Sequence, residues 1–264
     1  MYYRRSKLES FNENNIASIV NFIYNIDPNN YNQMLEINEW LIDNWFQVDI
    51  GIGVETKDKE KLDPIFRALA EVFPCDAPNK VYRGRVSMSF QKKISSFLFG
   101  VPAKDCKKLG QYRGLLYQAY LKKFKGDVEL AEDFLNNAKK IPLPKVLIEH
   151  PFIQTEIKRL AYGTRSWTVD KETAINWGWG RGEDTNVDSF VFVYKNPSPS
   201  DVLFPVDTYV EDYEAVAEYG EGGGGDEVPG FDWGEVIMSI KNPIIKSINL
   251  YPNFSECRYE VEIV

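Results

Sequence analysis

The chain has 264 residues, which is enough for one large domain or two small ones with a well-buried core. Its formal net charge of -8 argues against a protein that binds nucleic acid over its whole surface, because such proteins set lysine and arginine against phosphates; a local basic groove stays open. The three cysteines are odd in number and far apart, which disfavours a disulfide framework and a CxxC zinc site.

The first residues, MYYRRSKLESFNENN, contain no apolar core of a signal peptide. No apolar run approaches the roughly 20 residues that a membrane span needs. We therefore expect a cytoplasmic protein, of the producing or a host cell, that makes no use of a membrane.

The first third of the chain is predicted to be helical. Apolar residues recur at helical spacing in three segments, and Pro74 ends the third. These segments are 12–26, 36–46 and 62–73. They predict an N-terminal helical region over residues 1–75.

The pattern then changes to a strand and back to helices. Residues 79–90 alternate in polarity and carry β-branched and aromatic side chains, which predicts a strand. Helical spacing returns within 89–161, in 91–99, 112–124 and 128–140. We expect this stretch to be a helical insertion.

The last third is predicted to be rich in strands. A short helix at 171–179 precedes four segments that suit a sheet, namely 188–195, 235–240, 244–251 and 257–264. Helices first and a sheet-rich part afterwards indicate an α+β protein. Its second domain would cover 76–264.

The only histidine, His150, precedes a proline, which favours an extended turn. A structural role in a turn is the simpler interpretation. An enzyme built on this chain would therefore work with carboxylates, arginines and hydroxyls, and we expect no metal.

The stretch 218–234 is rich in glycine and carboxylates and cannot bury enough apolar surface to order itself alone. Two interpretations stay open. It is either a slack surface loop or a mobile loop that meets a substrate.

The triplet Tyr-Arg-Gly occurs twice, around Arg83 and around Arg113. Arg83 lies in an alternating strand pattern, and Gly84 after it allows close backbone approach of a ligand. Arg113 opens an amphipathic helix, where an arginine packs or is solvated. Arg83 is thus the candidate for a phosphate-binding fork, with a salt bridge across the sheet as the alternative.

Three motifs follow one another in the order KVYRG, SWTVDKETAINWG (166–178) and WGEVIM (233–238). This order resembles the Arg–Ser–Glu class of mono-ADP-ribosyltransferases, the cholera- and exotoxin-like group, which has intracellular phage-type members. In that family the first strand ends in Tyr-Arg-Gly, the second begins with Ser-x-Ser or Ser-x-Thr before a helix, and the third carries the catalytic Glu. The resemblance covers roughly 76–264 and implies a mixed or antiparallel β-sandwich-like core.

The resemblance implies that the substrate is NAD. Arg83 would hold its phosphates, and Gly84 would offer main-chain contacts to the nicotinamide amide. Ser166 would bind near the nicotinamide ribose and orient the glutamate, while Thr168 would brace the strand. Glu235 would bind the ribose 2′-hydroxyl and stabilise the cation that develops as nicotinamide leaves.

The same resemblance makes 177–186 a loop over the phosphates and the nicotinamide. Trp179 would stack on the nicotinamide ring, and Arg181 would reach a phosphate. The alternative is an ordinary glycine turn with an exposed tryptophan.

The chain departs from the family pattern two residues before the candidate glutamate. Trp233 stands where the family has Glu or Gln and cannot activate a guanidinium, so a protein arginine is not the expected acceptor. Asp232 and Glu227 are candidates to take over in this substrate loop.

Two motifs of the family occur twice in the chain, and in each case one copy has to be selected. The pair Glu260 and Glu262 also fits Glu-x-Glu, but no strand follows it, so we expect one face of a terminal strand. Arg113 would shorten the spacing to Ser166, yet the family's arginine lies on a strand, which favours Arg83.

These inferences favour an NAD-dependent mono-ADP-ribosyltransferase that modifies an intracellular macromolecule. The acidic chain favours a protein acceptor over nucleic acid, although the basic runs at 103–110 and 120–126 could form a positive patch. The alternatives are an NAD glycohydrolase, an RNA- or DNA-modifying ADP-ribosyltransferase, and an inactive module that binds NAD or protein. A toxin-like phage or plasmid effector, with an antidote or inhibitor protein as a partner, would fit this class.

Overall fold

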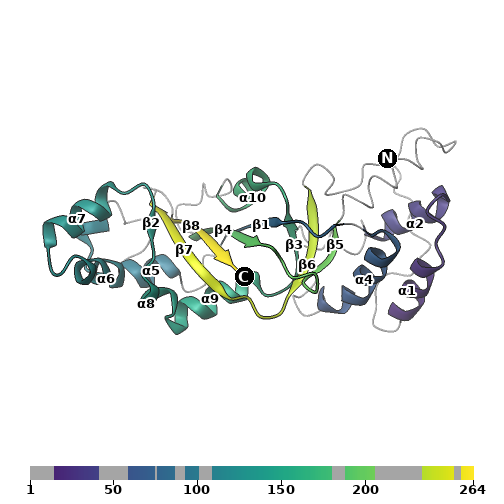
Figure 1. Cartoon of the computed structure of the whole chain (residues 1–264), viewed down its shortest axis with the longest axis horizontal. Helices are drawn as coiled ribbons and strands as arrows, with labels where there is room; N and C mark the ends of the chain where they lie inside the picture. The colour runs from purple at the N-terminus through teal and green to yellow at the C-terminus, as the bar shows by residue number, and fades with distance from the viewer. Residues whose placement is uncertain are drawn as a thin grey trace. The chain divides into compact units, whose positions relative to one another are not determined.

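The computed structural model describes eight stretches of the chain, 15–41, 59–74, 76–86, 93–100, 109–179, 188–205, 234–252 and 257–264. They combine helices with a mixed set of strands, which confirms the predicted α+β class (Figure 1). The chain divides into two compact units. The first unit contains 1–78, 163–169 and 197–241, and the second contains 79–162, 170–196 and 242–264.

The helical region predicted over residues 1–75 falls within the first unit. There the N-terminal helices share a unit with three strands from the middle and late parts of the chain. The reason is the apolar face of the third helix, which packs against one of those strands.

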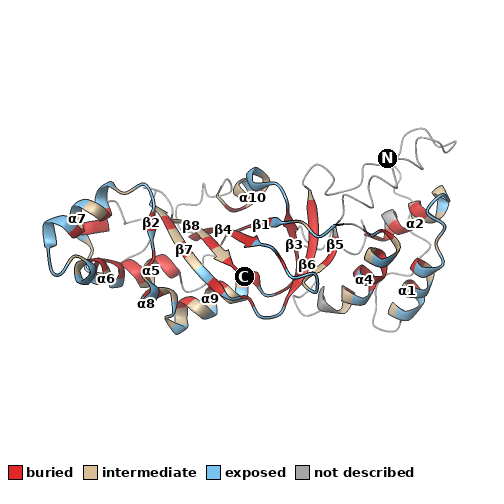
Figure 2. Cartoon of the chain, in the orientation of Figure 1, coloured by how far each residue is buried: buried red, intermediate tan, exposed pale blue. Residues whose placement is uncertain are grey.

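The strands of the first unit pair around β6 (Glu235–Ile240). On one side β3 (Gly163–Thr168) pairs with it antiparallel, from Gly163 opposite Ile240 to Thr168 opposite Glu235. On the other side lies β5 (Val202–Pro205), also antiparallel, with an irregularity between Val202 and Phe204. Every residue of β3 and β6 is buried (Figure 2). Strand β6 matches its predicted range, whereas no strand was predicted at β5.

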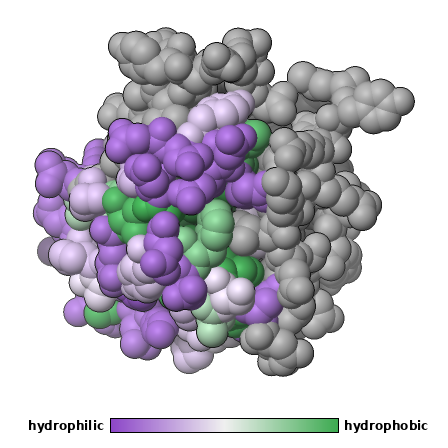
Figure 3. Space-filling model, turned by 90° about the vertical axis from the view of Figure 1, so that its right-hand side faces the viewer, coloured by the Kyte–Doolittle hydropathy of each residue, from purple (hydrophilic) through white to green (hydrophobic). Residues whose placement is uncertain are grey.

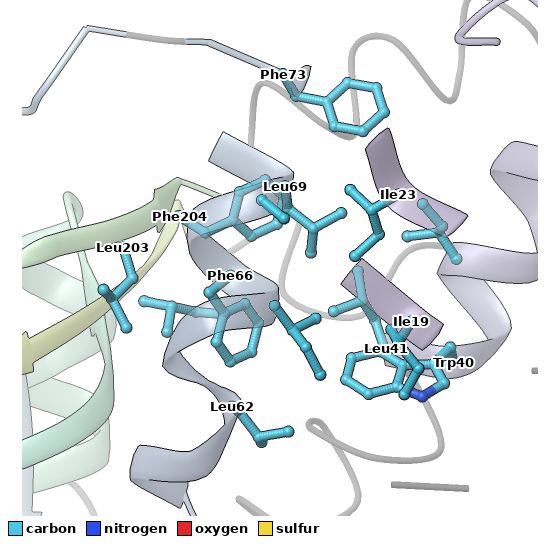
Figure 4. Close-up of a cluster of buried hydrophobic side chains, with 14 of the residues drawn as sticks. Ile19, Ile23, Trp40, Leu41, Leu62, Phe66, Leu69, Phe73, Leu203 and Phe204 are labelled. Carbon is cyan, nitrogen blue, oxygen red and sulfur yellow. The ribbon is translucent and has the colours of Figure 1, made fainter. Parts of the chain in front are cut away.

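The core of the first unit is built on α4 (Asp63–Val72). It follows the short 3-10 helix η2 (Lys59–Leu62) and buries Ile65, Phe66, Ala68 and Leu69. In Figure 4 Phe66 and Leu69 lie between Ile19 and Ile23 on one side and Leu203 and Phe204 on the other. The rings of Phe66 and Phe204 stack at 6.3 Å between centroids. Burying one such side chain stabilises the fold by about 1.5–3 kcal/mol.

Two more helices complete this cluster, α1 (Ile16–Tyr24) and α2 (Tyr31–Leu41). Helix α2 starts earlier than the predicted residue 36, because the side chain of Asn30 accepts the backbone N–H of Gln33 at 3.3 Å. Residues 42–46 of the predicted helix lie outside the described residues.

On the face of the molecule drawn in Figure 3, hydrophilic residues cover much of the described surface, and hydrophobic side chains show between them.

The second unit contains five neighbouring strands in the order β2-β7-β8-β4-β1. Its strands are β1 (Lys80–Val86), β2 (Ile141–Pro142), β4 (Asp188–Lys195), β7 (Ile245–Pro252) and β8 (Cys257–Ile263). The β4–β8 pair is parallel and the other pairs are antiparallel. Strands β1, β4, β7 and β8 confirm the predicted segments as far as these are described, whereas β2 was not expected.

The second unit also contains helices. They are α5 (Ile94–Phe99), α6 (Leu115–Lys123), α7 (Val128–Asn137), α8 (Lys145–Ile148), α9 (Pro151–Ala161) and α10 (Lys171–Gly178), with a 3-10 turn η4 (Leu109–Gln111). Of these, α8 and α9 contact β7, and α10 contacts β1 and β4. His150 caps α9, since its Nδ1 accepts the N–H of Phe152 at 3.2 Å and Pro151 takes the first helical position. The structural role predicted for His150 is therefore confirmed. None of the described helices has both the length and the apolar character needed to span a bilayer.

Helix α10 begins at a strong cap. The carboxylate of Asp170 accepts the N–H groups of Glu172 at 3.1 Å and Thr173 at 2.9 Å, and also the hydroxyl of Thr173 at 2.6 Å. The helix then packs on β1 and β4, where Ala174 joins a buried cluster with Tyr82 and Val191.

Replacing Asp170 by alanine removes the acceptor of these donors, and we expect the free energy of unfolding to fall by about 1 kcal/mol. The bonds from Thr173 hold the pKa of Asp170 below its ordinary value of 3.8. The stabilisation is therefore present above that value and is lost as the pH falls through the lower folded-state pKa. Urea unfolding between neutral and acidic pH measures this. Asp170→Asn keeps an accepting oxygen and should lose less at neutral pH; equal losses in both variants would contradict the account.

Candidate functional site

Arg83 lies in the middle of β1 and is 2% exposed. Its partner across the pair is Phe192 on β4, and the next residue on the same face, Arg85, is opposite Phe190. The ring of Phe190 stacks on Tyr259 of β8 at 5.1 Å. Arg83 thus lies on a strand, as the sequence predicted, and shares its face of the sheet with the aromatic side chains of Phe190, Phe192 and Tyr259. A guanidinium in such a place is costly unless an anion compensates it.

Gly84 has a packing reason for having no side chain. A Cβ there would collide with the backbone of Ala174 and Gly178 and lie 2.8 Å from the carbonyl carbon of Trp177. Gly178 is equally tight against the carbonyl oxygen of Phe190. The space at the Cβ position of Gly84 is therefore filled by α10. The main-chain contacts of Gly84 with a ligand stay a prediction.

Trp179, the residue after α10, packs on the sheet of the second unit. Its ring lies 5.2 Å from that of Tyr251 on β7, and the guanidinium of Arg258 on β8 lies 6.0 Å above it. Trp179 packs against the same cluster as Tyr82, which is on the opposite face of β1 from Arg83. The structure therefore does not bring Trp179 and Arg83 onto one face. Arg181 lies outside the described residues.

Arg113, in the second triplet, is a packing arginine as predicted. Its guanidinium contacts the carboxylate of Glu132 on α7 at 2.8 Å and lies 4.2 Å from the ring centre of Tyr117 on α6. More than half of its side chain is exposed. Between the two triplets, only Arg83 is a buried strand residue.

In the first unit the β3–β6 pair places three candidate residues on one face. Thr168 is directly opposite Glu235, and Ser166 is opposite Ile237, one step along the same face. Their exposed fractions are 0% for Thr168, 2% for Glu235 and 3% for Ser166. Directly opposite residues have Cβ atoms about 4.5–5.5 Å apart, whereas diagonal neighbours are about 7–8 Å apart. Thr168 is thus the closer strand neighbour of Glu235.

The far end of this face carries a hydrogen-bonded clamp that the sequence did not predict. The carboxylate of Asp63 at the start of α4 accepts the hydroxyls of Thr164 and of Ser239, the latter at 2.9 Å. The two hydroxyl oxygens lie 3.2 Å apart. Asp63 is 101 residues from Thr164 and 176 from Ser239, so no local pattern reveals the clamp. The sequence offers one indication of such a contact: hydroxyl side chains stand at alternate positions of β3, at Thr164, Ser166 and Thr168, and in a buried strand they need hydrogen-bond partners.

A second unpredicted carboxylate, Asp188, begins β4 and is buried. It accepts the N–H of Ser95 at 3.1 Å and so holds the start of α5. Burial raises the pKa of Asp188, and the hydrogen bonds with the start of α5 oppose this shift. Asp188 is two and four residues before Phe190 and Phe192, so it shares the face of Arg83.

Glu260 and Glu262 occupy one face of the terminal strand β8, as predicted. Glu260 contacts the ammonium groups of Lys140 at 3.5 Å and Lys171 at 3.7 Å. Glu262 contacts Lys195 at 3.2 Å and Lys246 at 3.0 Å. The hydrogen bond from Lys246 lowers the pKa of Glu262.

The candidate residues are thus distributed over both units. Ser166, Thr168 and Glu235 lie together in the first unit, and Arg83, Gly84 and Trp179 lie in the second. Trp233, Asp232 and Glu227 lie outside the described residues. Within the described ranges no three side chains of His, Cys, Asp or Glu gather as metal ligands.

No protein-family model, no curated protein and no solved structure matches this chain. The assignment of a function therefore rests on the motifs and on the geometry of the two units.

Gly84→Ala is expected to destabilise the fold by about 1–3 kcal/mol, because the new methyl group meets backbone atoms of α10 that cannot rotate away. Chemical denaturation measures the change. Asn176→Ala is the matched control, since it adds alanine to the exposed side of the same helix and should be neutral or slightly stabilising. Equal stability of Gly84→Ala and the wild type would show that α10 does not press on β1.

Proposed function

We propose that this protein is an NAD-dependent mono-ADP-ribosyltransferase of the Arg–Ser–Glu type. The observation that carries the proposal is the face shared by Ser166, Thr168 and Glu235, which sets one buried carboxylate beside two hydroxyls. The order and strand setting of the three motifs add to it. The finer fold assignment, an ADP-ribosyltransferase core, belongs to this proposal.

The reaction breaks the bond between nicotinamide and C1 of the ribose. The electron pair leaves with nicotinamide, which becomes neutral, and positive charge develops on the ribose. Glu235 accepts a hydrogen bond from the ribose 2′-hydroxyl and stabilises that charge. A carboxylate so placed contributes several kcal/mol, on the order of 10²–10³ in rate. The acceptor then bonds to C1 and gives its proton to water.

Ser166 and Thr168 act on the same end of the substrate. Their hydroxyls lie along β3 beside Glu235, so they suit hydrogen bonds that hold the carboxylate and the nicotinamide ribose. Neither residue needs to change protonation state. Their contribution is orientation, which enters catalysis by keeping the reacting groups aligned.

Arg83 binds the diphosphate of NAD in this proposal. An arginine presents a planar fork that matches phosphate oxygens, and burial strengthens such charge-assisted hydrogen bonds. The acceptor is a macromolecule in the cell. Protein is favoured because the chain as a whole is acidic, and a local positive surface keeps nucleic acid as the alternative acceptor.

Glu235→Gln keeps the size of the side chain and removes its charge, so nicotinamide release from NAD should fall by about 10²–10³. The purified chain and this variant are mixed with a cell lysate and with NAD labelled on the adenylate side. A thermal melt of both proteins establishes that the variant is folded.

The fate of the label separates the remaining alternatives. Label in a protease-sensitive product that only the wild type makes establishes protein ADP-ribosylation. Label lost to nuclease moves the acceptor to nucleic acid, and free ADP-ribose alone indicates a glycohydrolase. If both folded proteins leave NAD intact, the proposal is wrong and a module that binds without catalysis takes its place.

Arg83→Lys should raise the KM for NAD by about 10-fold or more, because a lysine cannot make the bidentate contact. Arg113→Lys is the control, since Arg113 is mostly exposed and serves α6 and α7. Steady-state kinetics of nicotinamide release measure both. A larger effect at Arg113 than at Arg83 would reverse the choice between the two triplets.

A further inference from the structure

One face of the sheet in the second unit carries an excess of positive charge. Six cationic side chains surround two carboxylates, Glu260 and Glu262, with three aromatic side chains among them. We call it the lysine face; its cations are Lys80, Lys140, Lys171, Lys195, Lys246 and Arg258, and its aromatic residues are Tyr82, Trp179 and Tyr251.

The strand registers place Lys80, Lys195, Arg258, Tyr251 and the two glutamates on the same side, and Lys140, Lys171, Lys246 and Trp179 join them through their contacts with Glu260, Glu262 and Tyr251. Lys80 is opposite Lys195, which shares its face of β4 with Val193, and Val193 is opposite Glu262. Along β8, Arg258 is opposite Tyr251 of β7. Opposite residues in a sheet point to the same face, so the set forms one surface that crosses four strands.

The two glutamates hold the lysines in place. Each carboxylate contacts two ammonium groups at 3.0–3.7 Å, while the four lysine side chains remain 46–59% exposed. The glutamate side chains are only 18–19% exposed. The lysines are therefore already ordered above the sheet, which reduces the entropy that a ligand must overcome.

Aromatic rings lie directly beside these cations. Lys140 is 5.6 Å from the ring centre of Tyr251, whose ring in turn contacts Trp179. At the other end Lys80 lies 5.1 Å from the ring of Tyr82. Tyr82 is only 8% exposed, so Tyr251 and Trp179 are the rings that a base can reach. Cations interleaved with aromatic rings are the combination that proteins use to bind single-stranded nucleic acid, with phosphates on the charges and bases against the rings.

We propose that the lysine face binds single-stranded nucleic acid. The net charge of -8 does not oppose this, because charges beyond about 8 Å are largely screened at physiological salt. Six cations against two carboxylates make the local field positive. An acidic peptide would use the lysines but not the partly exposed rings of Tyr251 and Trp179, so nucleic acid fits the surface better. This binding needs no NAD and is independent of the proposed function.

The test measures binding of fluorescent 12-nucleotide strands of uridine and of thymidine by anisotropy over a range of salt. Affinity should fall with salt, with a slope of about 0.7 per phosphate contact in a double-logarithmic plot. The triple variant Lys140→Gln, Lys195→Gln, Lys246→Gln should bind about 10-fold or more weakly and lose about 2 from that slope.

The matched control is Lys122→Gln, Lys123→Gln, Lys125→Gln, which removes the same charge from the basic run at the end of α6 and should bind like the wild type. A charge-preserving variant, with arginine at 140, 195 and 246, should also retain binding, and thermal melts confirm that each variant is folded. Tyr251→Leu should weaken binding several-fold without changing the salt slope.

Three outcomes overturn the proposal. The first is no binding by the folded wild type at low salt. The second is that the α6 control loses as much affinity as the lysine-face variant, which would place the site on the helices. The third is displacement of the strand by poly-glutamate as effectively as by unlabelled nucleic acid, which would make the partner an acidic protein.

Discussion

The pairing register of β3 with β6 decides which side chains accompany Glu235. Side chains alternate between the faces of a sheet, so a slip of one residue would carry Ser166 and Thr168 away from the glutamate. The Asp63 clamp opposes such a slip, because it bonds to one hydroxyl on each strand. The buried cluster of α4 holds Asp63 itself in position. The candidate carboxylate thus depends on a helix that lies far from it in the sequence.

The second unit depends on a different constraint, the close approach of α10 to β1. Gly84 and Gly178 permit this contact, and the helix covers the part of the sheet next to the lysine face. Strand β1 then has two uses. On the face of Arg83, the strand lies beside Asp188 and the rings of Phe190 and Phe192. On the face of Tyr82, it contacts α10 and contributes to the lysine face. A change on one side need not disturb the other.

Much of this architecture follows from local sequence patterns. Strands β4 and β6 coincide with their predicted ranges because each has a run of strand-forming apolar residues at its centre, 190–194 in β4 and 236–238 in β6. Strand β5 is four residues long, ends in proline and contains an irregularity, so its pattern is too weak to predict. Strand context also separated Arg83 from Arg113. Periodicity does not encode contacts between distant segments. It therefore could not predict that Gly84 packs against α10, on which face of the sheet Trp179 lies, or that Asp63 bonds to Thr164 and Ser239.

The interleaving of the two units has a consequence for how the chain is made. The first unit needs residues near the start, a strand from the middle and β6 near residue 240, while the second needs the terminal strand β8. The strands of either unit are complete only when most of the chain has been synthesised. Until then the N-terminal helices can pack on one another, but the part of α4 that contacts Leu203, Phe204 and Ile237 stays uncovered. Neither unit can be isolated by a single cut, and a ribosome-bound chain is the state most exposed to chaperones and proteases.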